Sequence, residues 1–285
     1  MRIAVVTDST ADIPNHIALK KSIRVIPAIL VIDGKSLVDG EGITRSQFYD
    51  LLPEIKTPPT TATPSIARFQ AVYDQLFQEG YENILSIHVA SQLSGMVSTA
   101  QIASKEFNGK VTVIDSGQLS LGLGFQVLAA SEFVADGCEM DQLLLNLQDI
   151  RQRIRVIAML DTLEYVRRSG RVSWARARIG SMLKIKPFVE VKGGKVLNRG
   201  QTRTRKKGIE HLISMCQKFG TIEKFAILHT NAESEANLLL AKLDESWTEP
   251  PMIVNVTTIV GAHVGPNGLG FAIILNNNPN FHQQI

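Results

Sequence analysis

Four turns rich in hydroxyl side chains contain the residues whose types and spacing could do chemistry. They are TDST (7–10), TTATPS (60–65), SQLSG (91–95) and DSGQLS (115–120). Ser94 and Gly95 are expected to open a helix, where unpaired backbone amides and the helix dipole favour an anion. The surrounding stretch 87–100 has no Lys, Asp, Glu or Cys. Such a corner would hold an anionic group through uncharged donors.

An alternation of strands and helices would position these turns. In the first half we predict strands over 3–9, 83–90 and 111–117, and helices over 44–55, 65–78, 94–107 and 121–135. Thr44 and Gln47 form a capping-box pattern, and the prolines of 56–64 exclude a helix or a central strand there. This rhythm predicts a parallel sheet with helices on both faces, whose ligands bind beyond the carboxyl ends of the strands. The hydroxyl-rich turns gather at those ends.

The second half is predicted to follow a bridging helix over 140–154. There we predict strands over 155–160, 224–230, 252–259 and 271–275, a hairpin over 188–202, and helices over 162–170, 204–219 and 233–246. A chain of 285 residues fits two domains better than one. The expected α/β fold has an N-terminal three-layer domain with a mostly parallel sheet (1–152) and a C-terminal domain with a mixed sheet (153–285), with the ligand between them.

Composition and charge narrow the possible functions. Hydrophobic residues make up 44% and charged residues 20%, which is typical of soluble globular proteins. The longest apolar run, 25–32, is far shorter than the ~20 residues that span a bilayer, so no stable membrane insertion is expected. Cys138 and Cys216 form no CxxC pattern, which favours a cytoplasmic location. Segment 151–207 carries 17 Lys and Arg against three acidic residues, so its surface either meets an anionic partner or is simply solvated.

Most catalytic and cofactor motifs are absent. DGKS (33–36) lacks the first glycine of a phosphate-binding loop, GLGFQV (122–127) lacks the third glycine of a dinucleotide fingerprint, and no G-x-S-x-G occurs. The six histidines show no metal-ligand spacing, so we expect neither a metal nor a cofactor. His88 alternates within a strand and is interpreted as a hydrogen-bonded core residue. His263 lies in GAHVGPNGLG (261–270), read as a glycine-rich loop, and is interpreted as functional.

Eight blocks of sequence together resemble the DegV family. They are VTDSTADIP (6–14), TATPS (61–65), SQLSG (91–95), VIDS (113–116), DTLEYVRRSGRV (161–172), KIKPFVEV (184–191), RTR (203–205) and HVGP (263–266). The resemblance implies a long-chain fatty acid, such as palmitate, bound between two α/β domains. In many bacteria it also implies service as the lipid-presenting subunit of a fatty acid kinase.

The same resemblance implies the site residues. Thr61 and Ser94 would bind the carboxylate of the fatty acid, and His263 would cover it. From the residues themselves we add Gly95, Ser91, Ser116 and Arg171 as secondary site candidates, and Arg203 and Arg205 as partner-facing candidates. Arg171 follows Gly170, which is expected to end a helix, and it is equally consistent with a surface residue that binds nothing. The chain departs from the family pattern with TATPS in place of TSQPS and with Asn267 where a glycine usually stands.

These observations predict a lipid-binding carrier or substrate-presenting subunit, not an enzyme, with a fatty acid and a kinase subunit as partners. Two alternatives stay open. The basic segment 151–207 would suit nucleic acid, although its aromatic residues are few, and Ser94 would suit a serine hydrolase that lacks an obvious histidine–acid pair. We expect no nucleic acid as partner.

Overall fold

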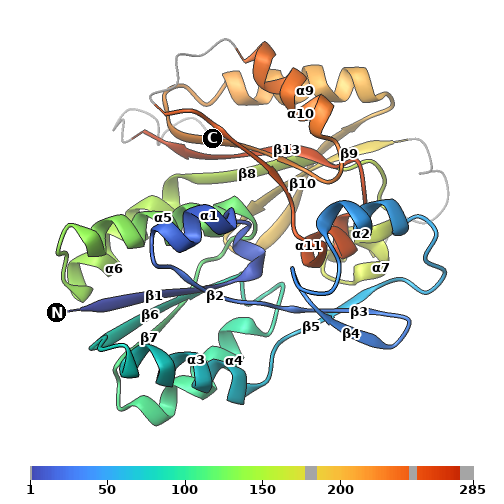
Figure 1. The fold of residues 1–285 in the computed structure, drawn as a ribbon. Coiled ribbons are helices and arrows are strands. Elements are labelled where there is room, and N and C mark those ends of the chain that lie inside the picture. Colours follow the sequence, from blue (N-terminus) through green and yellow to red (C-terminus); the bar gives the residue numbers. More distant parts are fainter. Residues whose placement is uncertain (1, 177–184, 244–248, 277–285) are drawn as a thin grey trace.

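The computed structural model describes residues 2–176, 185–243 and 249–276. Part of the basic segment (177–184) and the last residues of the expected C-terminal domain (277–285) lie outside the described residues. The described residues form three sheets, two large and one small, with helices between and around them (Figure 1).

The first large sheet has four parallel strands in the order β2-β1-β6-β7. Its strands are β1 (Ile3–Asp8), β2 (Arg24–Ile26), β6 (Asn83–His88) and β7 (Val111–Asp115). Helices α3 (Ile66–Gln78) and α4 (Met96–Ser104) cover one face, and α1 (Asn15–Lys20), α5 (Leu121–Ala135) and α6 (Met140–Arg153) lie on the other side (Figure 1). Two short 3-10 turns, Ser9–Ala11 and Lys105–Phe107, complete this part.

The second large sheet is mixed, with the order β10-β9-β8-β13-β11-β12. Its strands are β8 (Ile154–Met159), β9 (Lys186–Lys192), β10 (Lys195–Thr202), β11 (Ile222–His229), β12 (Met252–Asn255) and β13 (Leu269–Leu275). Helices α9 (Arg205–Gln217) and α10 (Glu233–Lys242) cover its outer face. Only β11 and β12 pair in parallel; the other neighbours are antiparallel. The predicted α/β class, with a parallel first sheet and a mixed second sheet, is confirmed.

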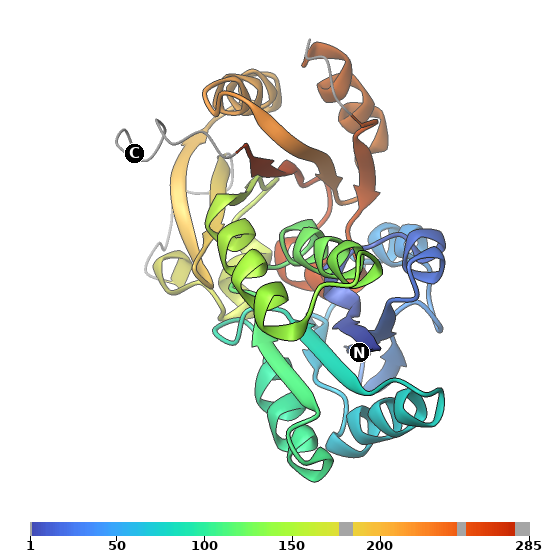
Figure 2. The same cartoon turned by 90° about the vertical axis from the view of Figure 1, so that its left-hand side faces the viewer.

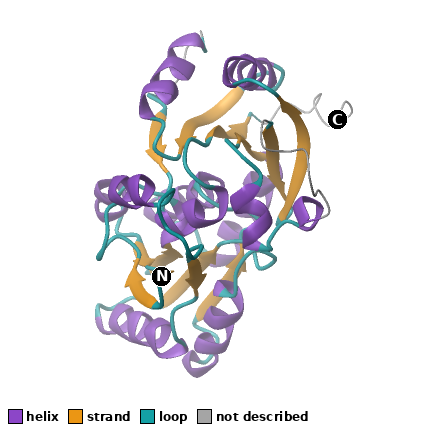
Figure 3. Cartoon of the chain, turned by 90° about the vertical axis from the view of Figure 1, so that its right-hand side faces the viewer, coloured by secondary structure: helices purple, strands orange, loops and turns teal. Residues whose placement is uncertain are grey.

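Helix α5 lies between the two large sheets. It contacts β1 and β6 on one side and β8 and β13 on the other, so the layers run helix, sheet, helix, sheet, helix (Figures 2 and 3). Its sequence LGLGFQVLAASEFVA has almost no polar face, which is what a helix covered on both sides requires. Gly124 permits this packing, since a Cβ there would lie 2.5 Å from the carbonyl oxygen of Ala11. One hydrophobic core therefore continues from the first sheet into the second.

A small antiparallel sheet, in the order β4-β3-β5, lies beside the first large sheet. Its strands are β3 (Ile29–Ile32), β4 (Lys35–Val38) and β5 (Thr60–Ala62), and α2 (Arg45–Leu51) lies between β4 and β5 in the chain. This sheet was not expected from the sequence. The prediction that 56–64 holds no helix or central strand still agrees with the structure, because β5 is an edge strand.

The end of the chain differs most from the expected elements. The strand expected over 252–259 ends at Asn255, and α11 (Thr258–Val264) follows it, with α7 (Glu164–Ser169) and α8 (Ser173–Arg176) elsewhere in the second half. The β-branched residues of VTTIV favour a strand by propensity, but long-range contacts decide here. All strands of the parallel sheet precede residue 116 and all strands of the mixed sheet follow 153, while the boundary at 152 stays a prediction.

Candidate functional site

A cavity of about 200 Å³ lies where the carboxyl ends of β1 and β6 approach the inner face of the mixed sheet. Side chains alternate on that sheet, so Val156 and Ala158 of β8 line the cavity, whereas Ile157 packs under α9 and α10. Lining residues come from five neighbouring strands, in the order β10, β9, β8, β13 and β11. Four steps of roughly 4.8 Å between strands give a path of about 19 Å. The cavity is therefore elongated and mostly apolar.

Hydroxyl side chains gather at the wall contributed by the first half of the chain. Thr61 comes from β5, where it pairs with Leu30, and Ser94 comes from the turn that follows β6. The Ser94 hydroxyl accepts a long hydrogen bond of 3.4 Å from the Met96 amide. Gly95 is the N-cap of α4 and also lines the cavity, where a Cβ would lie 3.2 Å from the Thr63 hydroxyl. The structure thus brings Thr61, Ser94 and Gly95 to one cavity.

His263 reaches the same wall from α11. Its Nε2 lies 2.8 Å from the Thr61 Oγ1, across more than two hundred residues of sequence. Burial and, to a smaller extent, the nearby Arg171 charge together lower the pKa of His263 to about 4. The ring is therefore neutral at neutral pH and has one donor and one acceptor nitrogen. The expected loop position was wrong: His263 lies in the last turn of a helix that ends at Gly265, whose φ is 80°.

Arg171 lies at the exposed edge of the cavity. It lines the cavity directly after Gly170, which ends α7 in a left-handed conformation. Its guanidinium donates to the Ser169 carbonyl over 2.7 Å, so the side chain folds back along its own turn. The structure thus supplies one cation close to the His263 and Thr61 pair.

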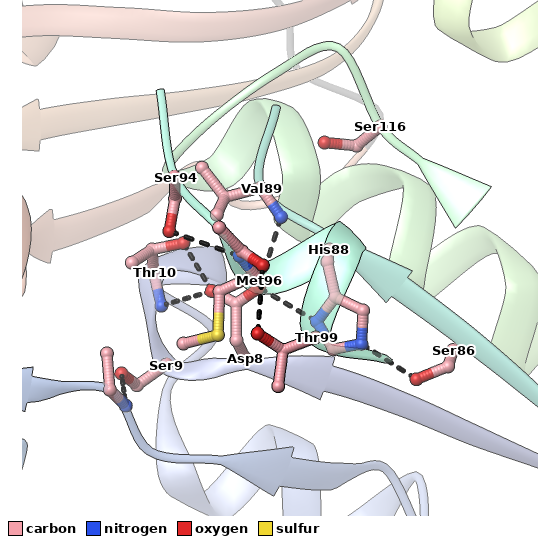
Figure 4. A network of polar contacts seen from close by, with 12 residues as sticks. Asp8, Ser9, Thr10, Ser86, His88, Val89, Ser94, Met96, Thr99 and Ser116 are labelled. Carbon is pink, nitrogen blue, oxygen red and sulfur yellow. Dashed lines mark hydrogen bonds and ion pairs between the residues drawn. The ribbon is translucent and has the colours of Figure 1, made fainter. Parts of the chain in front are cut away.

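Ser91 and Ser116 do not line the cavity. The Ser91 hydroxyl donates to Asp115 at 2.5 Å, and the buried Ser116 hydroxyl donates to the Gln118 carbonyl at 3.2 Å. Both hydroxyls therefore serve hydrogen bonds within turns, and Ser116 stands apart from the neighbouring polar network in Figure 4. Both serines became site candidates because they lie within hydroxyl-rich turns. In the structure their side chains point to other partners and not into the cavity.

The basic segment is partly neutralised within the chain. Arg205 pairs with Glu235 and donates to the Asn267 carbonyl, so it is an internal contact rather than a free charge. Arg153 pairs with Glu223, and Lys186 pairs with Asp161. Arg203 is exposed and does not line the cavity. Of the two partner-facing candidates, Arg203 alone is placed on the surface without one of these ion pairs.

A buried carboxylate that the sequence analysis did not single out organises the turn after β1. Asp8 accepts hydrogen bonds from the Thr10 amide and the Val89 amide, both at 3.1 Å, and from His88 Nδ1 at 2.9 Å; the Thr10 hydroxyl is its fourth donor (Figure 4). Thr10 and Val89 both line the cavity. Asp8 is the last residue of β1 and His88 is the last residue of β6, and these two strands are parallel neighbours. Their shared position at strand ends is the only signal in the sequence that could have paired them.

The same network continues away from the cavity. His88 Nε2 lies 2.7 Å from Ser86 Oγ, which lies 2.9 Å from the Tyr73 hydroxyl. The interpretation of His88 as a hydrogen-bonded core residue is confirmed. A buried polar chain in which each member has partners rigidifies its surroundings, so it fixes the strand end from which the SQLSG turn begins.

Among the residues that the structure describes, no group of three or more His, Cys, Asp and Glu side chains is placed to hold a metal ion. None of the described helices is both long enough and apolar enough to cross a membrane.

Comparison with known proteins identifies the family. The model of the DegV family, described as uncharacterised proteins, matches residues 2–276. The chain belongs to the DegV family. A DegV domain-containing protein of Deinococcus radiodurans is 32% identical over 278 residues, which cover 96% of this chain and 98% of that protein.

Solved DegV structures share the fold closely. A DegV family protein from Thermus thermophilus, described by its fatty acid binding, aligns with a TM-score of 0.89 at 30% identity, over 97% of this chain and 100% of that one. DegV of Bacillus subtilis, described as a fatty acid binding protein, aligns with a TM-score of 0.84 at 29% identity, over 97% and 100% of the two chains.

One departure from the DegV pattern now has a structural explanation. Asn267 stands where the family usually has a glycine, and it adopts a φ of 58°. Asn tolerates this left-handed conformation better than most residues. The Asn267 amide donates to the Thr230 carbonyl and its own carbonyl accepts from Arg205, so the turn keeps its shape without the glycine.

Proposed function

We propose that this DegV-family chain binds a long-chain fatty acid in the elongated cavity, with the carboxylate at Thr61 and Ser94 and beneath His263. The observation that carries the proposal is the combination of an apolar path of about 19 Å with an uncharged polar wall at Thr61, Ser94 and His263. The relatives from Thermus thermophilus and Bacillus subtilis, each described as binding fatty acid, support it.

The length of the path suits an acyl chain of about 16 carbons. Three backbone bonds of an extended polypeptide span 3.3–3.6 Å, so each bond advances about 1.2 Å, and the 15 bonds of a 16-carbon chain span roughly 18 Å. Each buried methylene contributes about 0.8 kcal/mol, so the tail supplies most of the gross affinity. The costs of association, estimated at about 4–15 kcal/mol, oppose it.

The polar wall would set which end of the ligand lies at the hydroxyl corner. Hydroxyl and amide donors can hold a carboxylate without a buried counter-charge, and a hydrogen bond to a charged group contributes about 1.5–3 kcal/mol. If Thr61 donates to the carboxylate, its oxygen is free to accept from His263, which then carries its proton on Nε2. The neutral ring thereby orients the Thr61 hydroxyl toward the ligand, and Arg171 adds a favourable charge at the exposed edge.

The binding proposal is tested by mass spectrometry of lipid extracted from the purified chain. Long-chain fatty acid in about equimolar amount is expected from the wild type, and less from a variant with both Thr61→Val and Ser94→Ala. An extract without fatty acid, from a chain that also takes up none when it is supplied, would refute the proposal.

We further propose that the chain presents the carboxylate to a separate kinase, which forms the acyl phosphate, and that it does not itself catalyse the transfer. The sequence has no phosphate-binding loop. Arg171 lies at the exposed edge of the cavity, where its charge would stabilise the phosphate of the product. The test is incubation of the palmitate-loaded chain with ATP and magnesium, with and without a purified ATP-binding kinase subunit of the same cell. Acyl phosphate formed by the chain alone would overturn the division of labour; formation only with the added subunit would support it.

A further inference from the structure

Helix α11, which carries His263, is held at its beginning by side chains from the first half of the chain. The Thr257 amide donates to Asp12 Oδ1 at 2.7 Å, and the Thr258 hydroxyl donates to Asp39 Oδ1 at 2.7 Å. The Tyr49 hydroxyl donates to the carbonyl of Val256 at 2.9 Å. Because an α-helix rises about 1.5 Å per residue, His263 lies only roughly 9 Å further along the same rigid element.

Asp12 connects this helix to a second wall of the cavity. Its Oδ2 accepts from the Ser120 hydroxyl at 2.5 Å, and Ser120 itself lines the cavity at the beginning of α5. Ser120 has φ 51° and ψ −145°, a conformation that residues with a side chain rarely adopt and that surrounding contacts must enforce. The Asp12 carboxylate therefore ties together α5 and α11, two elements that are far apart in the sequence and border the same cavity.

In the folded protein the ionised form of Asp12 is less favourable, relative to the protonated form, than it is in the unfolded chain. Asp12 is 1% exposed, and burial raises its pKa to about 6, against the lowering effects of Arg45 at 3.7 Å and of the two hydrogen bonds. The charged or titratable groups facing it are Arg45 and Tyr49 from α2 and Asp39 from the turn after β4; α5 and α11 present a hydroxyl and an amide. A carboxyl with a raised pKa favours folding below its ordinary pKa, and that contribution is lost as pH rises through about 6.

We propose that Asp12 is a positioning residue for the headgroup end of the cavity: its carboxylate fixes the beginning of α11, and through α11 it holds His263 against Thr61. The inference rests on the proposed fatty-acid site for its functional consequence, but the positioning itself is a property of the ligand-free chain. Asp12→Ala removes the acceptor for Thr257 and Ser120. Asp12→Asn keeps an oxygen for Thr257 and offers an amide to Ser120, so it preserves both contacts without the charge.

The first test needs no ligand. Nuclear magnetic resonance follows the imidazole titration of His263 in the wild type, Asp12→Ala, Asp12→Asn and the exposed control Asp74→Asn. Displacement of α11 in Asp12→Ala is expected to raise the pKa of His263 from its lowered value toward the ordinary value near 6.5, while the other two variants stay close to the wild type. An unchanged His263 titration in folded Asp12→Ala would overturn the proposal. Should that variant not fold, it is replaced in the comparison by Gly261→Ala, whose Cβ would lie 2.4 Å from the Tyr49 hydroxyl and so displace the same helix.

The second test measures release of the fluorescent fatty acid cis-parinarate into excess albumin between pH 5 and 7.5. Loss of the Asp12 anchor is expected to accelerate release about tenfold at pH 7.5, the effect of roughly one buried hydrogen bond. Protonated Asp12 keeps an oxygen for Thr257 and offers its own hydroxyl to Ser120, as the amide of Asp12→Asn does. The wild type and Asp12→Asn should therefore show the same pH profile of release, since titration of the ligand and of His263 is present in both. Faster release from Asp12→Asn than from the wild type, or release from Asp12→Ala within twofold of the wild type, would count against the positioning role. A wild type that takes up no cis-parinarate would instead refute the proposed function, and the imidazole titration would still decide the inference.

Discussion

The Thr61 hydroxyl is the sharpest point at which to perturb the proposed headgroup site. Thr61→Val replaces the hydroxyl by a methyl group of nearly the same size, so the shape of β5 and its pairing with Leu30 are kept. The ligand carboxylate would lose one donor, worth about 1.5–3 kcal/mol for a charged acceptor, and His263 Nε2 would lose its 2.8 Å partner. We therefore expect the Kd for palmitate to rise about 10- to 150-fold.

The matched control is Thr60→Val on the same strand, because Thr60 is exposed and does not line the cavity. Isothermal titration calorimetry of delipidated protein gives Kd for both variants, and thermal unfolding shows whether the fold is kept. A double-mutant cycle with His263→Gln adds a second criterion: since His263 would act through the Thr61 hydroxyl, the combined loss should be smaller than the sum of the single losses. Binding by Thr61→Val within twofold of the wild type, or strict additivity in the cycle, would refute this account of the headgroup site.

Three further outcomes are expected. Across saturated fatty acids from 10 to 18 carbons, Kd should fall about fourfold per methylene and level off near 16 carbons, where the path of about 19 Å is filled. A series that keeps improving without a break would contradict the length derived from the strand spacing. His88→Leu deprives Asp8 and Ser86 of a buried partner and should lower the free energy of unfolding by about 3–5 kcal/mol in urea titrations, whereas His16→Leu on the exposed part of α1 should change it little. Because burial lowers the pKa of His263 to about 4, its contribution to stability is complete above about pH 6.5 and is lost as pH falls toward 4. The difference in unfolding free energy between wild type and His263→Gln should therefore change by roughly 3 kcal/mol over that interval, and a constant difference would speak against a neutral, buried ring.

Local sequence signals predicted those elements that local chemistry determines. Thr44 and Gln47 form the predicted capping box, and Ser65 caps α3 at the start of the helix predicted over 65–78; both caps depend on residues three positions apart. The helix over 121–135 was predicted to its ends, since a continuous apolar run after a serine-rich turn leaves few alternatives. The hairpin between β9 and β10 turns at Gly193 and Gly194, within the predicted range 188–202.

Elements that depend on distant contacts were not predicted. Helix α11 has the composition of a strand, and the amide of its N-cap Thr257 donates to Asp12, more than two hundred residues earlier. Asp8 lies in the TDST turn (7–10), which the sequence analysis singled out for its hydroxyls, and Asp12 follows two residues later. In the structure the carboxylates of both residues accept buried hydrogen bonds. The sequence did place Thr61, Ser94 and His263 among the candidates through family resemblance, and the structure places all three at one cavity.

The position of α5 between the two large sheets has a consequence for how the chain can be made and altered. Ten residues of α5 are buried and sheets lie on opposite sides of it, so the helix has no polar face that could be exposed to water if one sheet were removed. Either half expressed without the other would expose a broad apolar surface and be prone to aggregate. For the same reason neither half should unfold alone, and the chain should denature in a single cooperative transition. A chimera that joins the two halves of different relatives should then fold only if the residues of both sheets that contact α5 come from the same relative as α5 or match its side chains in shape.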